Sequence, residues 1–268
     1  MSFVTPQPGD PMEARGSLML VADGMGGHAA GEVASEIAVE TVRRVYYELT
    51  GPMPHVLGSA FLAAHRAIAD WAKNNPECKG MGTTCTAVAI CDGDAWLAHV
   101  GDSRAYLLRD GAMTQLSEDQ TLVAQMVREG QLSPEEARNS PVSNVILQAL
   151  GPNAEVVPVV WSEPLKLAAD DVVVLCTDGL TGVVPDRIIA QHAGTLPPDE
   201  ACEALIHAAH AGGAPDNVSV GVFRLMAATD LSTADESPNP AGTTRRVKYV
   251  SDEATDRSSR QTRKVNLS

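Results

Sequence analysis

The strand-like segments of this chain come in hairpin-like groups, and pairs of helical segments lie between the groups. Short β-branched and apolar runs stop at Asp-Gly or Gly-Asp dipeptides, which favour tight turns. Because a parallel sheet needs a helix between successive strands, this order predicts antiparallel sheets covered by helices. We expect strands at residues 18–23, 83–90, 95–100, 105–108, 156–160, 172–176 and 218–225, and helices at 29–49, 56–73, 119–130, 133–139, 185–193 and 198–211.

The composition supports one globular domain followed by a tail. Of the 268 residues, 44% are hydrophobic but only 4% are aromatic, so aliphatic side chains must fill the core. The last segment is rich in Ser, Thr, Asp and Arg, which is typical of disorder, although its basic stretches would also suit phosphorylation or docking of a partner. We therefore expect a single domain at residues 1–227 and a disordered tail at 228–268.

Charge and cysteine content limit the partners and the compartment. The net charge is −14, and the body of the chain lacks the basic footprint of nucleic-acid binding. No apolar run reaches the roughly 18 residues of a membrane span, and the N-terminus does not resemble a secretory signal. The cysteines are odd in number and lack a Cys-x-x-Cys pair, which is typical of a reducing compartment. We expect a cytoplasmic protein that binds neither nucleic acid nor a membrane.

Four aspartates lie where an apolar strand meets a turn. They are Asp23, Asp102, Asp178 and Asp216, each beside a glycine or asparagine that tolerates a tight backbone. A single aspartate in such a place is typical of an Asx-turn. The side chains of all four would converge if their strands end at the same edge of a sheet. Converging carboxylates repel one another unless a cation lies among them. Oxygen ligands favour Mg²⁺ or Mn²⁺ over zinc, so the sequence predicts a site for these ions.

An oxygen-ligated pair of ions suits the hydrolysis of phosphate esters. Two ions about 4 Å apart can lower the pKa of a bridging water and direct it in line at phosphorus. The sequence has no Gly-x-Ser-x-Gly elbow and no Cys and Arg at the spacing of cysteine-dependent phosphatases. It also lacks the Gly-rich Lys-Ser/Thr loop of nucleotide triphosphatases. The pattern favours attack by water without a covalent intermediate.

Five short motifs occur in register between residues 18 and 225. They are Asp23-Gly24-Met25-Gly26-Gly27-His28, Gly82-Thr83-Thr84, Gly101-Asp102-Ser103-Arg104, Thr177-Asp178-Gly179-Leu180 and Asp216-Asn217-Val218-Ser219. Together they resemble the bacterial type 2C metal-dependent protein phosphatases. The resemblance implies an α+β fold, a four-layer α-β-β-α sandwich of two antiparallel sheets flanked by helix pairs. It also implies hydrolysis of phosphoserine and phosphothreonine in proteins by a metal-bound hydroxide.

The resemblance assigns a role to each aspartate. Asp23 resembles the carboxylate that bridges two catalytic ions, and the carbonyl of Gly24 would bind the second ion. Asp178 and Asp216 would complete the ligands of the first ion, and Asp102 would help to hold a third. The implied cofactors are two Mn²⁺ or Mg²⁺ ions with a weaker third one. The implied partners are phosphoproteins, the substrates of a Ser/Thr kinase.

The beginning of the chain departs from the family pattern. Family members usually start with a strand that carries an arginine and an Asn-Glu-Asp-like motif, and this strand is missing here; Arg15 is a poor replacement for that arginine. We expect an N-terminally incomplete phosphatase, because all the aspartates are retained. The alternative is a catalytically weak or silent phosphoprotein-binding member of the same fold. A third option is a regulator of a sigma-factor pathway.

No catalytic side chain is assigned from the sequence. His28 is a candidate general acid for the leaving oxygen, and the alternative is a solvent-facing histidine at the start of a helix. Arg104 is expected to pair with a nearby acid, and His99 to be a hydrogen-bonded core residue. Gln120 occupies a position where the family often has histidine, and we draw nothing from it.

Overall fold

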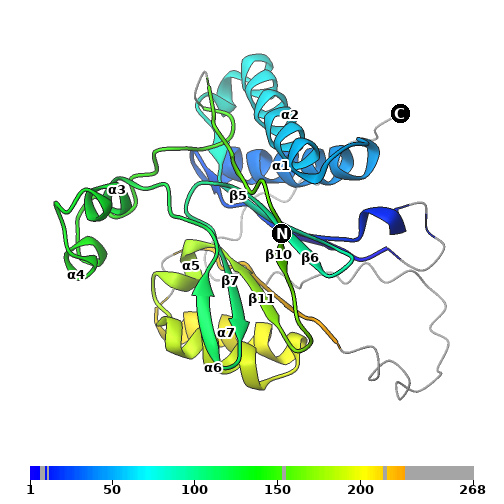
Figure 1. Ribbon diagram of the computed structural model, residues 1–268. Helices are drawn as coiled ribbons and strands as arrows, with labels where there is room; N and C mark the ends of the chain where they lie inside the picture. The colour runs from blue at the N-terminus through cyan, green and yellow to red at the C-terminus, as the bar shows by residue number, and fades with distance from the viewer. Residues whose placement is uncertain (7–9, 11, 153–154, 214–215, 227–268) are drawn as a thin grey trace, which may run out of the picture.

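Two antiparallel sheets lie face to face between helices in the computed structural model, which describes residues 1–6, 10, 12–152, 155–213 and 216–226 (Figure 1). Helices α1 and α2 cover one sheet and helices α5 to α7 cover the other, so the four-layer α-β-β-α prediction is confirmed. The predicted tail at 228–268 lies outside the described residues.

The first sheet contains the hairpin that the sequence predicts around Asp92-Gly93. Both turn residues have positive φ, 52° and 77°, as a two-residue hairpin of the Asp-Gly type requires. Residues 2–4, where no strand was expected, form the edge strand β1. In order, the strands are β1 (Ser2–Val4), β2 (Ser17–Val21), β5 (Cys85–Cys91), β6 (Asp94–Val100) and β10 (Leu165–Lys166), with β9 (Val159–Val160) also paired to β6.

The second sheet contains a hairpin of the same Asp-Gly type at Asp110-Gly111. These two residues have φ values of 52° and 77° and join β7 to β8, so this predicted hairpin is also confirmed. The apolar run of β11 lies at the centre of the sheet, where both faces are buried. The strands are, in order, β12 (Val220–Arg224), β11 (Val172–Cys176), β7 (Arg104–Arg109) and β8 (Ala112–Gln115).

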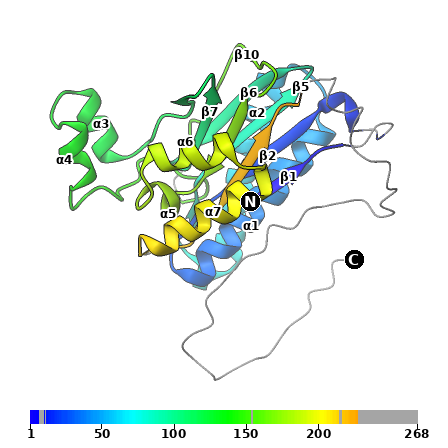
Figure 2. The same cartoon turned by 90° about the horizontal axis from the view of Figure 1, so that it is seen from below.

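The helices form two covering layers and one projecting arm. Viewed from below, α6 and α7 run across the second sheet, while α3 and α4 stand away from the body (Figure 2). We call residues 122–138, which include these two short helices, the α3–α4 arm. The helices are α1 (His28–Glu48), α2 (Met53–Asn74), α3 (Leu122–Arg128), α4 (Pro134–Arg138), α5 (Asp178–Thr181), α6 (Asp186–Thr195) and α7 (Pro198–Ala211), with 3-10 turns at Glu13–Arg15 and Pro76–Cys78.

Three hydrophobic clusters hold the layers together. The first lies between α1, α2 and the first sheet, and Phe61 and Leu20 are fully buried in it. The second lies between the second sheet and helices α5 to α7. The third lies between the two sheets, where Val88 and Leu97 face Val173 and Leu175. Aliphatic side chains dominate all three clusters, as the scarcity of aromatic residues predicts.

Some expected boundaries of helices and strands differ from those in the structure. The helix expected at 119–130 begins only at Leu122, because Thr121 is its N-cap and accepts a hydrogen bond from the amide of Ala124 (3.2 Å). The strand expected at 156–160 is reduced to Val159–Val160. By contrast, Ser133 begins α4 as expected, in a reciprocal capping box with Glu136.

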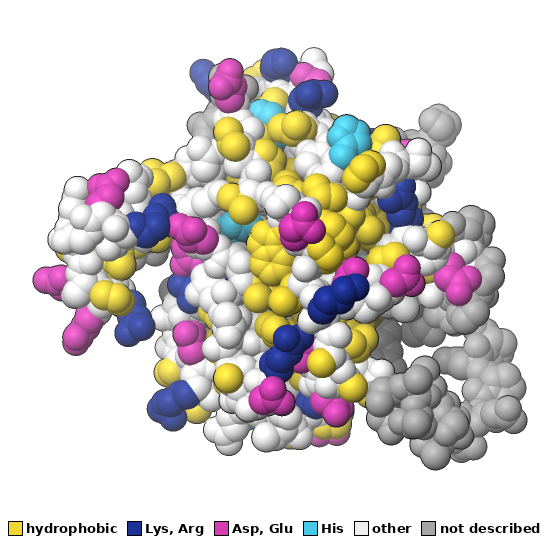
Figure 3. All heavy atoms as spheres, in the orientation of Figure 1, with side chains coloured by type: hydrophobic (Ala, Val, Ile, Leu, Met, Phe, Trp, Pro, Cys, Tyr) yellow, Lys and Arg dark blue, Asp and Glu magenta, His cyan; other side chains and the backbone are white. Residues whose placement is uncertain are grey.

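The surface in the orientation of Figure 3 is apolar at its centre, over β6 and β10. Lys, Arg, Asp and Glu side chains are scattered around this region, and on this face they do not form a concentrated basic patch. No helix within the described residues is both long and apolar enough to cross a membrane.

Candidate metal centre

Asp23 follows β2 and is held by its backbone. Its N–H donates to Thr84 Oγ1 (3.0 Å), and its carbonyl accepts from the amide of Thr84 (2.9 Å). Thr83 Oγ1 also donates to that carbonyl (2.8 Å). Both threonines are buried. The backbone of Asp23 is therefore fixed by three hydrogen bonds, and its half-buried side chain projects from a rigid support.

Gly24 lies in a minimal two-stranded sheet beside the start of α1. Strand β3 (Gly24–Met25) pairs with β4 (Gly82–Thr83), and Gly24 lies opposite Thr83. A Cβ atom on Gly24 would lie 1.9 Å from the carbonyl oxygen of Gly31, so only glycine fits at this position. This close approach holds the Gly24 backbone against the first turn of α1.

Asp178 and Asp216 lie in two loops that are joined to each other. The amide of Thr177 donates to the carbonyl of Ser219 (3.0 Å), and the amide of Ser219 donates to Thr177 Oγ1 (3.0 Å). A Cβ atom on Gly179 would lie 2.3 Å from the carbonyl oxygen of Asn217, so the loops are in direct contact. Asp178 begins α5 and is half-buried, whereas Asp216 is exposed.

Asp102 occupies the turn from β6 to β7, between the two sheets. Its neighbour Gly101 has a φ of 107°, a conformation that favours glycine. Gln120 forms two hydrogen bonds with the backbone of Gly101. Its side-chain Oε1 accepts from the Gly101 N–H (2.8 Å), and its backbone N–H donates to the Gly101 carbonyl (2.8 Å). Asp102 is 8% exposed.

The four aspartates influence one another electrostatically. Burial raises the pKa of Asp23 to about 8, and the carboxylates of Asp178, Asp216 and Asp102 add to this increase. Burial also raises the pKa of Asp102 to about 7, again with a contribution from Asp178. The structure thus brings all four sequence-predicted aspartates into one region, from four separate loops.

The donor set fits a hard cation. Asp178 Oδ1 is buried and has no hydrogen-bond partner within the described residues, and an unsatisfied buried carboxylate oxygen is costly unless a cation or water binds it. In the described part of the chain, no group of three or more carboxylate, imidazole or thiol side chains could hold a metal ion by itself. An ion here would also need backbone oxygens, such as that of Gly24, and water, which Mg²⁺ and Mn²⁺ accept.

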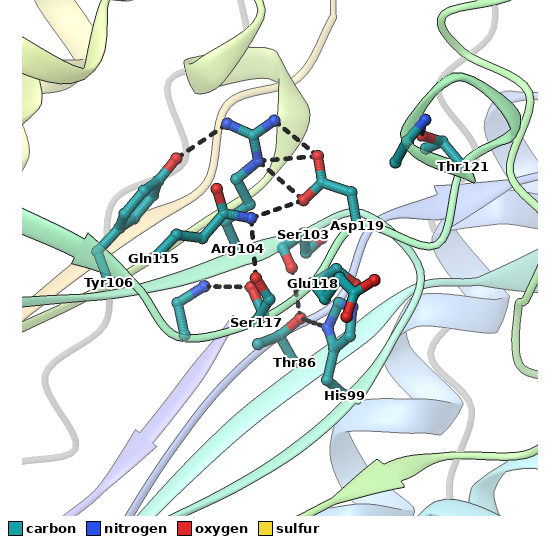
Figure 4. Close-up of polar contacts among 12 residues, drawn as sticks. Thr86, His99, Ser103, Arg104, Tyr106, Gln115, Ser117, Glu118, Asp119 and Thr121 are labelled. Carbon is teal, nitrogen blue, oxygen red and sulfur yellow. Dashed lines mark hydrogen bonds and ion pairs between the residues drawn. The ribbon is translucent and has the colours of Figure 1, made fainter. Parts of the chain in front are cut away.

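Arg104 is a structural residue, as predicted. Its guanidinium forms a two-pronged ion pair with Asp119, with Nη2 2.6 Å from Oδ2 and Nε 2.9 Å from Oδ1 (Figure 4). Arg15 also has a structural role. It donates to the carbonyls of Leu49 and Gly51 at the end of α1, away from the four aspartates.

His99 is a satisfied core histidine, which confirms the prediction. Its Nε2–H donates to the carbonyl of Glu118 (3.0 Å), and its Nδ1 lies 2.8 Å from Thr86 Oγ1 (Figure 4). Burial lowers the pKa of His99. His28 begins α1, and its side chain lies outside the described residues, so its role as a general acid stays a prediction.

Two contributions to the site were missed in the sequence. Gln120, which fixes the loop of Asp102, had a usable signal, because it stands where the family often has histidine. Ser103 was noted only as part of a motif. Its hydroxyl lies 2.7 Å from that of Thr84, a contact between residues 19 apart that no local sequence pattern indicates.

Known proteins resemble this chain over most of its length. A family model described as protein phosphatase 2C matches residues 12–197. The chain is 40% identical over 218 residues to the serine/threonine protein phosphatase PstP of Mycobacterium tuberculosis, a match that covers 81% of this chain but 42% of that protein. It is 36% identical over 223 residues to the serine/threonine phosphatase Stp of Listeria monocytogenes, covering 80% of this chain and 85% of Stp.

A solved structure shows the same likeness. The crystal structure of the catalytic domain of PstP in complex with two manganese ions matches with a TM-score of 0.72 and 39% identity, over 79% of this chain and 89% of that one. The match of the family model to most of the chain, the sequence relatives and the shared fold lead to one conclusion. The chain belongs to the bacterial type 2C family of metal-dependent protein phosphatases.

Proposed function

We propose that this chain hydrolyses phosphoserine and phosphothreonine in proteins with the help of bound divalent cations. The observation that carries this proposal is the convergence of Asp23, Asp102, Asp178 and Asp216. Burial and neighbouring carboxylates raise the pKa of Asp23 to about 8. Such crowding is unfavourable for the folded chain unless a cation compensates it.

Each of these residues has a proposed part in binding. Asp23, the carbonyl of Gly24, Asp178 and Asp216 would hold two ions, and Asp102 would help to hold a third. When bound, the ions would supply an activated water at neutral pH and stabilise charge on the phosphoryl oxygens. Thr83 and Thr84 hold the backbone of Asp23 in place. His28 is our candidate for donating a proton to the leaving oxygen.

The relatives support the finer points of the proposal. A structure of the PstP catalytic domain is in complex with two manganese ions, so we propose Mn²⁺ as the first metal to test and Mg²⁺ as the second. We further propose phosphoproteins made by a Ser/Thr kinase as the substrates, the cytoplasm as the location and residues 1–227 as the catalytic domain.

The test measures phosphate release from a phosphothreonine peptide in Mn²⁺ and in excess EDTA. Asp178→Ala should abolish both turnover and Mn²⁺ binding. Asp70→Ala, which changes an exposed acid on α2, should leave both unchanged. Calorimetric Mn²⁺ binding without turnover would instead mark a silent phosphoprotein-binding member of the fold. Absence of both binding and turnover in the wild-type chain would overturn the proposal.

A further inference from the structure

Two buried hydroxyl groups connect Asp23 to the loop of Asp102. Thr84 Oγ1 accepts a hydrogen bond from the amide of Asp23 (3.0 Å) and lies 2.7 Å from Ser103 Oγ. Ser103 is the residue directly after Asp102. Thr84 and Ser103 are 1% and 0% exposed, so water does not compete for this contact.

This contact joins the two sheets at the candidate metal centre. Thr84 immediately precedes β5 of the first sheet, whose neighbour β2 leads to Asp23. Ser103 immediately precedes β7 of the second sheet. The bond between the two hydroxyls therefore connects the start of β5 in the first sheet to the start of β7 in the second.

Close packing reinforces the contact on both sides. A Cβ atom on Gly101 would lie 2.6 Å from Thr84 Cβ, so the backbone of Gly101 rests directly on the Thr84 side chain. Thr86 Oγ1 donates to the carbonyl of Ser103 (2.7 Å), which fixes the backbone of Ser103 as well. The side chain of Thr84 and the backbone of Ser103 are thus held in place by neighbours as well as by the contact between the hydroxyls.

We propose that Thr84 and Ser103 are positioning residues that fix the separation between Asp23 and Asp102. The inference rests on the proposed function, in which Asp23 bridges two ions and Asp102 helps to hold another. In this proposal the two hydroxyls act only through the positions of the two aspartates. Loss of such supporting hydrogen bonds behind metal ligands commonly reduces metal affinity about 10- to 100-fold.

The experiment measures Mn²⁺ binding to the full chain by calorimetry after removal of metal with a chelator. Thr84→Val keeps the shape of the side chain but removes the hydroxyl, and should weaken Mn²⁺ binding about tenfold or more. Thr84→Ser restores the hydroxyl and should bind nearly as tightly as the wild type. Thr41→Val is the matched control, because Thr41 is also buried but lies on α1, 13 residues from its start.

A double-mutant cycle separates positioning from general destabilisation. Ser103→Ala should also weaken Mn²⁺ binding, because it breaks the contact with Thr84. Thr84→Val breaks the same contact and also removes the acceptor of the Asp23 amide. The double variant Thr84→Val/Ser103→Ala should therefore bind no more weakly than Thr84→Val alone. Circular dichroism and thermal unfolding confirm that each variant is folded at the assay temperature.

The outcomes distinguish this inference from the proposed function. Wild-type affinity in Thr84→Val, failure of Thr84→Ser to restore binding, or strictly additive losses in the cycle would each overturn the positioning role while leaving a metal-dependent enzyme intact. A wild-type chain that neither binds Mn²⁺ nor releases phosphate would overturn the function itself.

Discussion

Arg104 and Asp119 form a fork-to-fork ion pair that joins β7 to the segment leading into the α3–α4 arm (Figure 4). The pair is partly buried, with 26% of the Arg104 side chain and 16% of the Asp119 side chain exposed. Arg104 also donates to the hydroxyl of Tyr106 (3.0 Å), and Gln115 donates to Asp119 Oδ1 (2.9 Å). These contacts fix the base of the arm to the second sheet.

This network predicts that Arg104 supports stability rather than metal binding. Arg104→Ala leaves a partly buried carboxylate without its main partner, which should lower the free energy of unfolding by about 2 kcal/mol. Arg104→Lys keeps the charge but not the two-pronged geometry, so its free energy of unfolding should lie between those of the wild type and Arg104→Ala. Urea unfolding of the metal-free chain measures both changes.

The control for this prediction is Arg43→Ala. The pair of Arg43 with Glu40 is exposed at 42% and 60% of the side chains, so its loss should cost less than about 1 kcal/mol. If Arg104→Ala removed Mn²⁺ binding without changing stability, Arg104 would belong to the metal centre and the structural assignment would be wrong.

The raised pKa of Asp23 predicts how the metal-free chain responds to pH. Its folded-state pKa is about 8, against 3.8 for an unperturbed aspartate. Between these values the folded chain binds more protons than the unfolded chain, so the contribution of Asp23 to stability falls as pH rises. We expect Tm to decrease from pH 5 to pH 8 without metal, and Mn²⁺ to reverse much of the loss at pH 8.

Asp23→Asn tests the origin of this slope. The variant cannot lose the proton, so its Tm should vary less between pH 5 and pH 8 and should respond weakly to Mn²⁺. Asp70→Asn, at an exposed position on α2, should behave like the wild type. An unchanged slope in Asp23→Asn would assign the pH dependence to other groups.

The close approach of Gly179 to Asn217 leads to a prediction about Mn²⁺ affinity, because it joins the loops of Asp178 and Asp216, two of the proposed metal ligands. In Gly179→Ala the new Cβ would lie 2.3 Å from the carbonyl oxygen of Asn217, so the loop that carries Asp216 must shift. Mn²⁺ affinity should fall about tenfold or more, and Tm should fall as well. Gly58→Ala, on α2, is the control. The new Cβ would lie 3.8 Å from Val160 Cγ2, which is an ordinary van der Waals distance. Equal Mn²⁺ affinity of the two variants would contradict the prediction.

Local chemistry made much of the fold predictable from the sequence. Each Asp-Gly hairpin depends on two residues with positive φ, and both were found where the dipeptides occur. The alternation of strand groups and helix pairs predicted antiparallel sheets covered by helices, and the family resemblance implied the four layers. The four aspartates were found because each is placed by a strand end and a small neighbour, which are local features as well.

The remaining features depend on contacts between distant residues. Strands β3 and β4 have two residues each and exist because Gly24 meets Thr83, which in turn pairs with Leu150. The contact of Thr84 with Ser103 and that of Gln120 with Gly101 each join residues 19 apart. Single hydroxyl and amide side chains have no periodic pattern, so the sequence could indicate candidate metal ligands but not what holds them in place.

Asp171 carries the last prediction, which concerns acid stability. This aspartate is 2% exposed and accepts hydrogen bonds from Arg109 Nε (2.9 Å), Arg109 Nη2 (2.6 Å) and the amide of Ala168 (2.7 Å). The hydrogen bonds from Arg109 are the main reason that the pKa of Asp171 is lowered from 3.8. Its stabilising contribution is therefore fully present above about pH 4 and is lost as pH falls below that value.

Asp171→Asn keeps the size of the side chain but removes the charge that pairs with Arg109. At pH 7 we expect a loss of about 1–2 kcal/mol in the free energy of unfolding, since the half-exposed Arg109 can be hydrated in the variant. Near pH 3, below the unperturbed pKa of 3.8, the carboxyl of the unfolded wild-type chain binds a proton more readily than that of the folded chain, so the difference between the two proteins should shrink. Urea midpoints at both pH values measure this, and a difference that stays constant from pH 7 to pH 3 would show that shape, not charge, makes Asp171 important.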